Sequence, residues 1–200
     1  MTRTDDIIAH FKKKDLTLYS VLENIELNVL EPSHNYFEDL CDSIVSQQLS
    51  IKAAATIFSR FKDLMPSKKI TPENILMLSH QQLRNAGLSN AKAVYIKDLA
   101  QKVHNNEIHF EKFLEMTEDE IITELTKVKG IGRWTAEMFL MFTLAREDVF
   151  SHGDLGLQNA IRNLYKLKKR PTEKYMQRLS SRWKPYRTYA ARILWKSLSK

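Results

Sequence analysis

The sequence of 200 residues is poor in cysteine, with Cys41 as its one example. A single cysteine excludes an intrachain disulfide and a cysteine-ligated iron–sulfur cluster, and it favours an intracellular location. No stretch approaches the ~20 apolar residues of a membrane helix, and the N-terminus lacks a long apolar core, so we expect a soluble protein without a membrane partner. The six histidines show no zinc-site spacing, and we expect no catalytic metal.

Glycine and proline are also scarce, with five of each. Apolar residues recur at helical spacing through nearly the whole chain, and the sequence therefore predicts an all-α protein. A chain of this length can bury roughly 70% of its unfolded surface, which suits one domain or two tightly joined lobes. In the first part of the chain we expect two opening helices within 7–25, broken near 14–17, then helices at 36–48 and 51–61 and a connector between Pro66 and Pro72. A short helix begins at Ser79 and ends at Gly87. The helices expected after it lie at 91–103, 110–116, 118–128, 135–145, 155–165, 172–180 and 186–198.

Positive charge is concentrated at the C-terminal end of the sequence. The chain carries a formal charge of +7, but the segment from Arg162 to Lys200 has 13 basic residues and one acid, a charge of +12, which leaves −5 for the rest. A basic face of this kind favours binding to phosphate backbones or to anionic membrane surfaces. For the run Lys168–Arg170 alone, a solvated lysine-rich face is the other interpretation.

Two glycines one residue apart separate two predicted helices in the stretch VKGIGRWTAE, residues 128–137. Gly130 and Gly132 can adopt a positive φ and bring bare backbone close to another surface. The amide groups of such a hairpin, which ends in a helix N-terminus, attract an anion. Glycine is also the ordinary way to end a helix, so this short pattern by itself fits both interpretations.

A longer set of residues resembles the helix-hairpin-helix (HhH-GPD) DNA glycosylases, and within them the monofunctional 3-methyladenine DNA glycosylase II branch, the alkylbase glycosylases. The segments that carry the resemblance are VKGIGRWTAEMFLMF at 128–142, DVFSHGDLGL at 148–157, IVSQQLSIKAA at 44–54, RWKPYR at 182–187 with Trp195, and Gly87, Leu88, Ser89 and Lys92. The resemblance implies a single HhH-GPD domain in which two helical lobes, about 35–130 and about 1–30 with 135–200, surround a DNA-binding cleft. Some relatives have an additional N-terminal domain, whereas this chain begins almost at the shared helical unit.

Asp154 is the catalytic residue that the resemblance implies. Breaking an N-glycosidic bond builds positive oxocarbenium character on the sugar, which a facing carboxylate stabilises, and the same group can orient or deprotonate water. Gly153 and Gly156 leave room for a close approach. The position of Asp154 also suits the N-cap of a helix that starts at Leu155, and the two roles are compatible.

Trp134, Met138 and Trp195 match the positions that line the pocket for the flipped base. A cationic alkylated purine gains ~0.5 to 2 kcal/mol from each favourable contact with an aromatic face. Tryptophan and methionine at helical spacing are also typical of a core, which is the structural alternative. Bifunctional relatives have a lysine nucleophile where this chain has Trp134, and tryptophan cannot form a Schiff base. We therefore expect hydrolysis without a lyase step.

Gln48 and Leu49 match the loop that fills the gap left by the extruded nucleotide. Either side chain is long enough to take the place of a base, and the alignment favours Gln48, with Leu49 as its neighbour. An ordinary helix C-terminus is the alternative for both residues.

The hairpin is expected to bind the DNA backbone through the amides of Gly130 and Gly132, aided by Arg133 and Thr135. In the family a monovalent cation, Na⁺ or K⁺, often lies under this hairpin. The main-chain carbonyls that match its ligands belong to Thr126, Val128 and Ile131.

These observations predict a base-excision repair enzyme that flips alkylated purines of the 3-methyladenine and 7-methylguanine type out of damaged double-stranded DNA. It would hydrolyse the N-glycosidic bond and leave an abasic site, acting as a monomer. A catalytically silent helix-hairpin-helix DNA-binding module would share the charge and the hairpin but would not need Asp154. A basic helical protein that contacts RNA or membrane lipid is a third possibility, which the hairpin disfavours.

Overall fold

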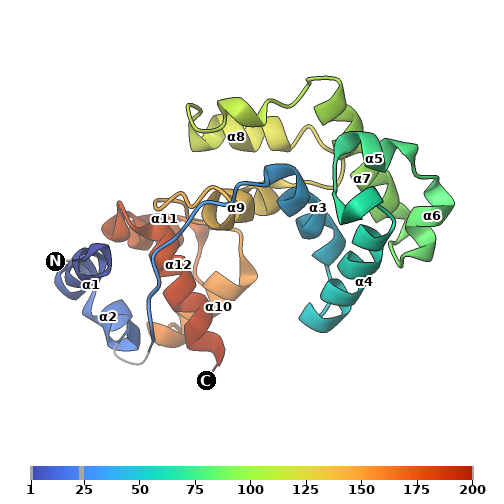
Figure 1. The fold of residues 1–200 in the computed structure, drawn as a ribbon. Helices are drawn as coiled ribbons and strands as arrows, with labels where there is room; N and C mark the ends of the chain where they lie inside the picture. Colours follow the sequence, from blue (N-terminus) through green and yellow to red (C-terminus); the bar gives the residue numbers. More distant parts are fainter. Residues whose placement is uncertain (1, 23–24, 200) are drawn as a thin grey trace. The chain divides into compact units, whose positions relative to one another are not determined.

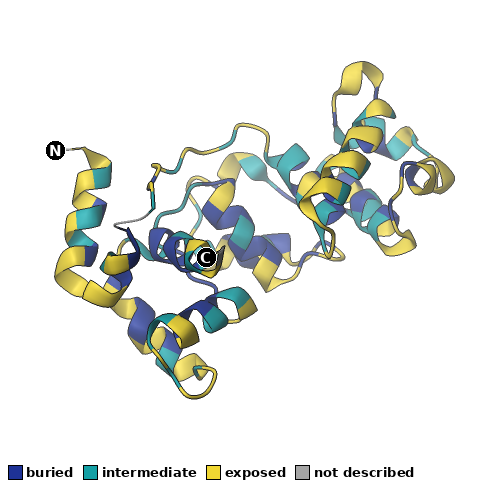
Figure 2. Cartoon of the chain, turned by 90° about the horizontal axis from the view of Figure 1, so that it is seen from below, coloured by how far each residue is buried: buried dark blue, intermediate teal, exposed yellow. Residues whose placement is uncertain are grey.

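The protein is all-helical in the computed structural model, which describes residues 2–22 and 25–199 (Figure 1). The described residues form helices and connecting turns with no β-strand, so the predicted fold class is confirmed. The chain divides into two compact units, Ser33–Phe139 and the combination of Met1–Pro32 with Leu140–Lys200. Helices in each unit have a buried face and an exposed face (Figure 2), as amphipathic sequences require.

The unit Ser33–Phe139 is organised around one long helix, α7 (Asn90–His104), which packs against α3, α5 and α6. Ala93, Ile96 and Leu99 of α7 are fully buried in this core. The other elements of the unit are α3 (Tyr36–Ser46), α4 (Ile51–Asp63), η1 (Pro66–Lys68), α5 (Pro72–Met77), α6 (His80–Asn85), η2 (Phe110–Lys112), α8 (Glu118–Leu125) and most of α9 (Arg133–Phe142).

Short polar side chains fix where the helices of this unit begin. The hydroxyl of Ser50 accepts the amide hydrogen of Ala53, and that of Ser89 accepts the amide hydrogen of Lys92. Both N-caps are as predicted, because an N-cap needs only residues that are close in sequence. Ser79 also begins its helix as predicted, within a capping box.

One helix was not predicted, and several predicted helices are shorter than expected. The connector between Pro66 and Pro72 is present and contains η1, but α5, which was not predicted, follows it at Pro72 behind the N-cap Thr71, since proline suits the first position of a helix. The predicted helix at 36–48 ends at Ser46, because the C-cap Gln47 has a non-helical ψ of 130°, and Gln48 then adopts a left-handed φ of 57°. The predicted helix at 110–116 is only the short η2 turn.

The unit made from the two ends of the chain is organised around α12 (Arg187–Lys196), which packs against α2 and α10. Its other elements are α1 (Arg3–Lys14), α2 (Leu16–Leu22), α10 (Leu155–Leu164), α11 (Glu173–Ser180), η3 (Ser181–Trp183) and η4 (Ser197–Ser199). The second opening helix was expected to reach residue 25, and positions 23 and 24 of that prediction lie outside the described residues. Across the described part of the chain, no helix combines the length and the apolar character that a membrane span requires.

The buried carboxylate of Asp15 ties the two ends of the chain together inside this unit. Asp15 is 7% exposed and lies between α1 and α2. Its Oδ1 accepts the amide hydrogen of Leu18 at 3.0 Å, and its Oδ2 accepts the Tyr165 hydroxyl at 2.6 Å and the Trp183 indole N–H at 3.0 Å. Burial and the bond to Asp15 raise the pKa of Tyr165, which keeps this hydroxyl a donor.

Replacing Asp15 with alanine is expected to lower the free energy of unfolding by roughly 3 kcal/mol, because three buried donors lose their acceptor. Urea unfolding followed by circular dichroism measures the change. Asp63→Ala is the control, since Asp63 forms an ion pair with Lys68 in which the two side chains are 52% and 71% exposed, and such a pair contributes less than about 1 kcal/mol. Equal losses in the two variants would contradict this role of Asp15.

Candidate functional site

The carboxylate of Asp154 is held between a helix end and an indole ring. Asp154 is 8% exposed and is the N-cap of α10. Its Oδ1 accepts the amide hydrogen of Leu157 at 2.7 Å and the Trp195 indole N–H at 3.0 Å. Negative charge at a helix N-terminus is favourable, and the indole bond fixes the direction of the carboxylate. The expected N-cap is therefore present, and the same carboxylate has a second donor from α12.

Gly156 allows the carboxylate and the indole to meet. A Cβ added at Gly156 would lie 3.0 Å from Oδ1 of Asp154 and 3.2 Å from both Cδ1 and Nε1 of Trp195. A Cβ at Gly153 would meet no heavy atom within 4 Å. Of the two glycines expected to permit a close approach, only Gly156 has these neighbours.

An apolar surface adjoins Asp154 in the same unit. The ring of Trp195 lies 5.9 Å from that of Phe142, and the two rings are tilted by 33°. Phe142 is 50% exposed, and Leu155, which follows Asp154, is 59% exposed. The sequence pattern predicts no site role for Phe142 or Leu155. Helical spacing placed Phe142 in an apolar run, and only its exposure in the structure distinguishes it from the core residues of that run.

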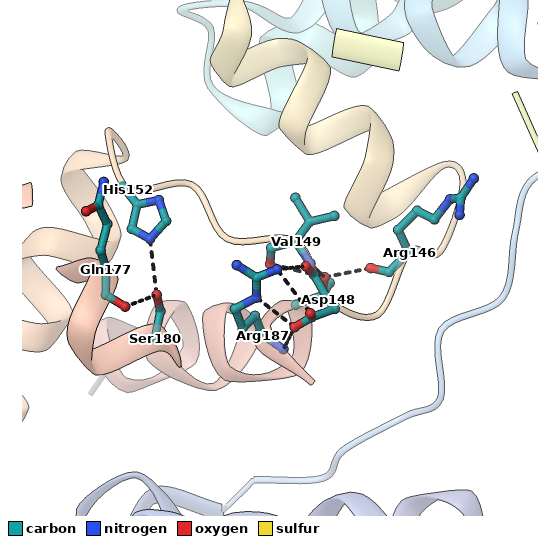
Figure 3. Close-up of polar contacts among 8 residues, drawn as sticks. Arg146, Asp148, Val149, His152, Gln177, Ser180 and Arg187 are labelled. Carbon is teal, nitrogen blue, oxygen red and sulfur yellow. Dashed lines mark hydrogen bonds and ion pairs between the residues drawn. The ribbon is translucent and has the colours of Figure 1, made fainter. Parts of the chain in front are cut away.

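The loop that leads to Asp154 is anchored on α12 (Figure 3). Arg187 makes a two-point ion pair with Asp148, with Nε 2.7 Å from Oδ1 and an Nη 3.0 Å from Oδ2. The amide of Val149 donates to the Thr188 hydroxyl at 3.0 Å, and that hydroxyl lies 2.6 Å from the carbonyl oxygen of Arg146. These contacts fix both ends of the segment 146–149, so the chain reaches Asp154 from a defined position.

His152 continues this anchoring toward α11. Its Nε2 lies 3.1 Å from the Ser180 hydroxyl, which in turn donates to the carbonyl oxygen of Gln177 (Figure 3). The carbonyl oxygen of His152 accepts the side-chain amide of Gln158 at 3.1 Å. His152 therefore helps to hold the two residues that precede Asp154.

In the other unit, the hairpin between α8 and α9 turns at Gly130. Gly130 has a φ of 82°, and the ring of Tyr95 occupies the space that a Cβ would need. The side-chain amide of Gln47 donates to the carbonyl oxygen of Gly130 at 2.9 Å. Gly132 was also expected to use a positive φ, but the positive values among the described glycines are at Gly87 and Gly130. A single left-handed residue is enough to reverse the chain here.

The other residues predicted to contact the DNA backbone differ in exposure. Arg133 has a side chain that is 66% exposed, and its Nε donates to Oε1 of Glu137 at 2.9 Å. Thr135 is only 5% exposed, so its side chain contributes to packing.

The main-chain carbonyls predicted to bind a cation belong to the end of α8 and the hairpin. The carbonyl oxygen of Val128 accepts the amide hydrogen of Ile131 at 3.1 Å. At Thr126 it is the side-chain hydroxyl that is bonded, and it donates to the carbonyl oxygen of Ile122 at 2.8 Å. Among residues 2–22 and 25–199, no group of three or more His, Cys, Asp or Glu side chains forms a metal site.

The remaining predicted site residues lie at the surface of their own units. Trp134 is 49% exposed in the first turn of α9, and Met138 follows one turn later with partial exposure. Trp134 is therefore not a core residue, which was the structural alternative. Gln48 is exposed and Leu49 is 38% exposed, directly after α3.

The all-helical fold with a glycine hairpin and a capped, buried aspartate defines the class of this protein. The family described as HhH-GPD superfamily base excision DNA repair protein matches residues 41–185, and the chain belongs to this family. DNA-3-methyladenine glycosylase 1 of Schizosaccharomyces pombe is 39% identical over 163 residues, which cover 80% of this chain and 72% of that protein. A putative DNA-3-methyladenine glycosylase of Bacillus subtilis is 31% identical over 198 residues, which cover 96% of this chain and 68% of that protein.

Solved structures of similar proteins agree with this assignment. The crystal structure of a DNA-3-methyladenine glycosidase from Bacillus halodurans matches with a TM-score of 0.84 at 37% identity, over 95% of this chain and 88% of that one. The Schizosaccharomyces pombe 3-methyladenine DNA glycosylase Mag1, in complex with abasic DNA, matches with a TM-score of 0.83 at 35% identity, over 96% of this chain and 95% of that one. The fold is therefore that of the 3-methyladenine glycosylases.

Adding a methyl group at Gly156 is expected to push the Asp154 carboxylate away from Trp195, because the new Cβ would lie within 3.2 Å of both. In an amide NMR spectrum, Gly156→Ala should shift the indole N–H resonance of Trp195. Gly153→Ala is the matched control and should leave that resonance in place. An unchanged Trp195 resonance in Gly156→Ala would show that the indole bond tolerates the methyl group.

Proposed function

We propose that this protein is a base-excision repair DNA glycosylase that removes alkylated purines, of the 3-methyladenine and 7-methylguanine type, from double-stranded DNA. The observation that carries the proposal is the buried carboxylate of Asp154, which two donors hold in one direction. Its family, and relatives named for the release of 3-methyladenine, support the same activity. The product is an abasic site, and the Mag1 structure holds abasic DNA.

The chemistry needs negative charge where the sugar becomes positive. As the glycosidic bond breaks, oxocarbenium character develops, and a fixed carboxylate in a poorly solvated site stabilises it without reorganising. Asp154 would supply this charge and would orient or deprotonate the attacking water. An alkylated purine is already cationic and leaves readily, so the enzyme does not need a strong general acid. We assign contact with the flipped base to Trp195 of one unit and to Trp134 and Met138 of the other.

The rest of the chain supplies DNA binding. The turn at Gly130 leads into the N-terminus of α9, where the first amides have no intrahelical partner and favour a phosphate. The charge of +12 between Arg162 and Lys200 favours the backbone more generally. The main-chain carbonyls of Thr126, Val128 and Ile131 are oxygen donors that suit Na⁺ or K⁺, which would fix the hairpin dipoles when bound.

We infer that base release proceeds without strand cleavage. A lyase step requires an amine nucleophile, and this chain has Trp134 at the position of the lysine found in bifunctional relatives. Water is then the nucleophile. We propose that the protein acts as a monomer.

Replacing Asp154 with asparagine separates its charge from its structural role. Asparagine keeps an oxygen that can accept the Leu157 amide and the Trp195 indole, and it is an equally good N-cap. Asp154→Asn is expected to fold with a similar melting temperature but to release methylated purines at least about 100-fold more slowly, because the transition-state cation loses its counter-charge.

The measurement is base release from duplex DNA containing methylated purines, with strand nicks counted separately without alkali. Wild-type protein should release bases and make no nicks. Equal release by Asp154→Asn would place catalysis on another residue. Tight binding without release by the wild type would favour a silent helix-hairpin-helix DNA-binding module.

A further inference from the structure

The turn that carries Gln48 and Leu49 has an unfavourable backbone conformation. Gln48 has a φ of 57°, in the left-handed region that a residue with a side chain seldom adopts. Such a conformation persists only when surrounding contacts hold it. Because Gln48 and Leu49 are the residues proposed to fill the gap in the DNA, what holds this turn matters for the reaction.

Lys92 of α7 holds the main chain of this turn. Its Nζ donates to the carbonyl oxygens of Val45 and Gln47, each at 2.7 Å. These carbonyls lie at the C-terminal end of α3, where the last carbonyls of a helix lack intrahelical partners and attract a cation. The side chain of Gln47 also donates to the carbonyl oxygen of Gly130, so the turn is tied to the hairpin as well. Desolvation lowers the pKa of Lys92, in keeping with an ammonium that has left water for these two carbonyls.

We propose that Lys92 is a positioning residue, which fixes the turn at 47–49 so that Gln48 and Leu49 can enter the DNA stack when the damaged nucleotide leaves it. The inference rests on the proposed glycosylase function and deepens it. Extruding a nucleotide from the duplex loses its base pairing and its stacking. A turn that is already ordered does not add the entropy cost of ordering its residues at that moment. Losing the two bonds should therefore hinder flipping more than the later chemistry.

The same helix offers a matched control residue. Lys97 donates to the carbonyl oxygens of Leu76, at 2.9 Å, and Leu78. These carbonyls end α5, which carries none of the residues assigned to the site. Desolvation lowers the pKa of Lys97 as it does that of Lys92. Lys92→Met and Lys97→Met thus remove the same charge and the same kind of helix cap, while each methionine keeps most of the apolar stem.

The experiment measures single-turnover excision of the same methylated purine in two duplexes. In one the lesion faces its normal pairing partner, and in the other it faces an abasic site, where no base pair resists extrusion. Lys92→Met is expected to slow excision from the paired duplex about tenfold, the loss that one charge-assisted hydrogen bond can cause, and from the unpaired duplex less than about twofold. Lys97→Met should match the wild type on both. Lys92→Arg, which restores a cationic donor, should recover most of the paired-duplex rate.

A purely structural role would give a different pattern. Equal loss on both duplexes, or equal loss in Lys92→Met and Lys97→Met, would overturn the positioning role while leaving the proposed function intact. If the wild type released no base from either duplex, the proposed function would fail and the inference with it. Should Lys92→Met not fold, Lys92→Gln can still donate to one carbonyl and should show the same preference for the unpaired duplex, with a smaller loss.

Discussion

A buried carboxylate must have donors around it, and this requirement shapes the unit that contains Asp154. A charged group that leaves water loses several kcal/mol of solvation unless hydrogen bonds replace it. Asp154 meets the requirement with the first turn of α10 and with the indole of Trp195. A Cβ at Gly156 would lie 3.0 Å from that oxygen and 3.2 Å from the indole, so a side chain there would press on both groups. The carboxylate, the helix end and the indole therefore depend on one another.

A second buried carboxylate in that unit, that of Asp15, is also surrounded by donors, and there the bonds stabilise the fold. Asp15 has a backbone amide, a hydroxyl and an indole as donors, and they come from parts of the chain up to 168 residues away. The ion pair between Arg187 and Asp148 then fixes the loop that leads to Asp154. A carboxylate placed in this way needs little rearrangement, which is the condition for the electrostatic stabilisation of a transition state that we propose for Asp154.

In the unit Ser33–Phe139 the corresponding constraint is the supply of donors to carbonyl groups at the ends of helices. Lysine side chains of α7 cap two of these ends, and a glutamine side chain ties the turn after α3 to the hairpin at Gly130. Tyr95 packs where Gly130 has no side chain, so the left-handed turn is also sterically selected. The backbone geometry of the turn at 47–49 and of the hairpin is thus set by side chains from elsewhere in the same unit.

The sequence by itself determined the features that depend on neighbouring residues. Scarce glycine and proline with helical spacing predicted the all-α fold, and the N-caps at Ser50, Ser89 and Asp154 followed from short polar residues before apolar runs. The residues around Gly130 and Asp154 indicated the family to which the chain belongs. The tertiary structure decided what those residues meet: the indole of Trp195 on Asp154, the ring of Tyr95 under Gly130, and the ammonium of Lys92 on the turn of Gln48. It also showed that Thr135 is buried and that Phe142 is exposed. Capping and periodicity act within one or two helical turns, whereas these contacts join residues that are dozens of positions apart, and only the packing of helices brings such residues together.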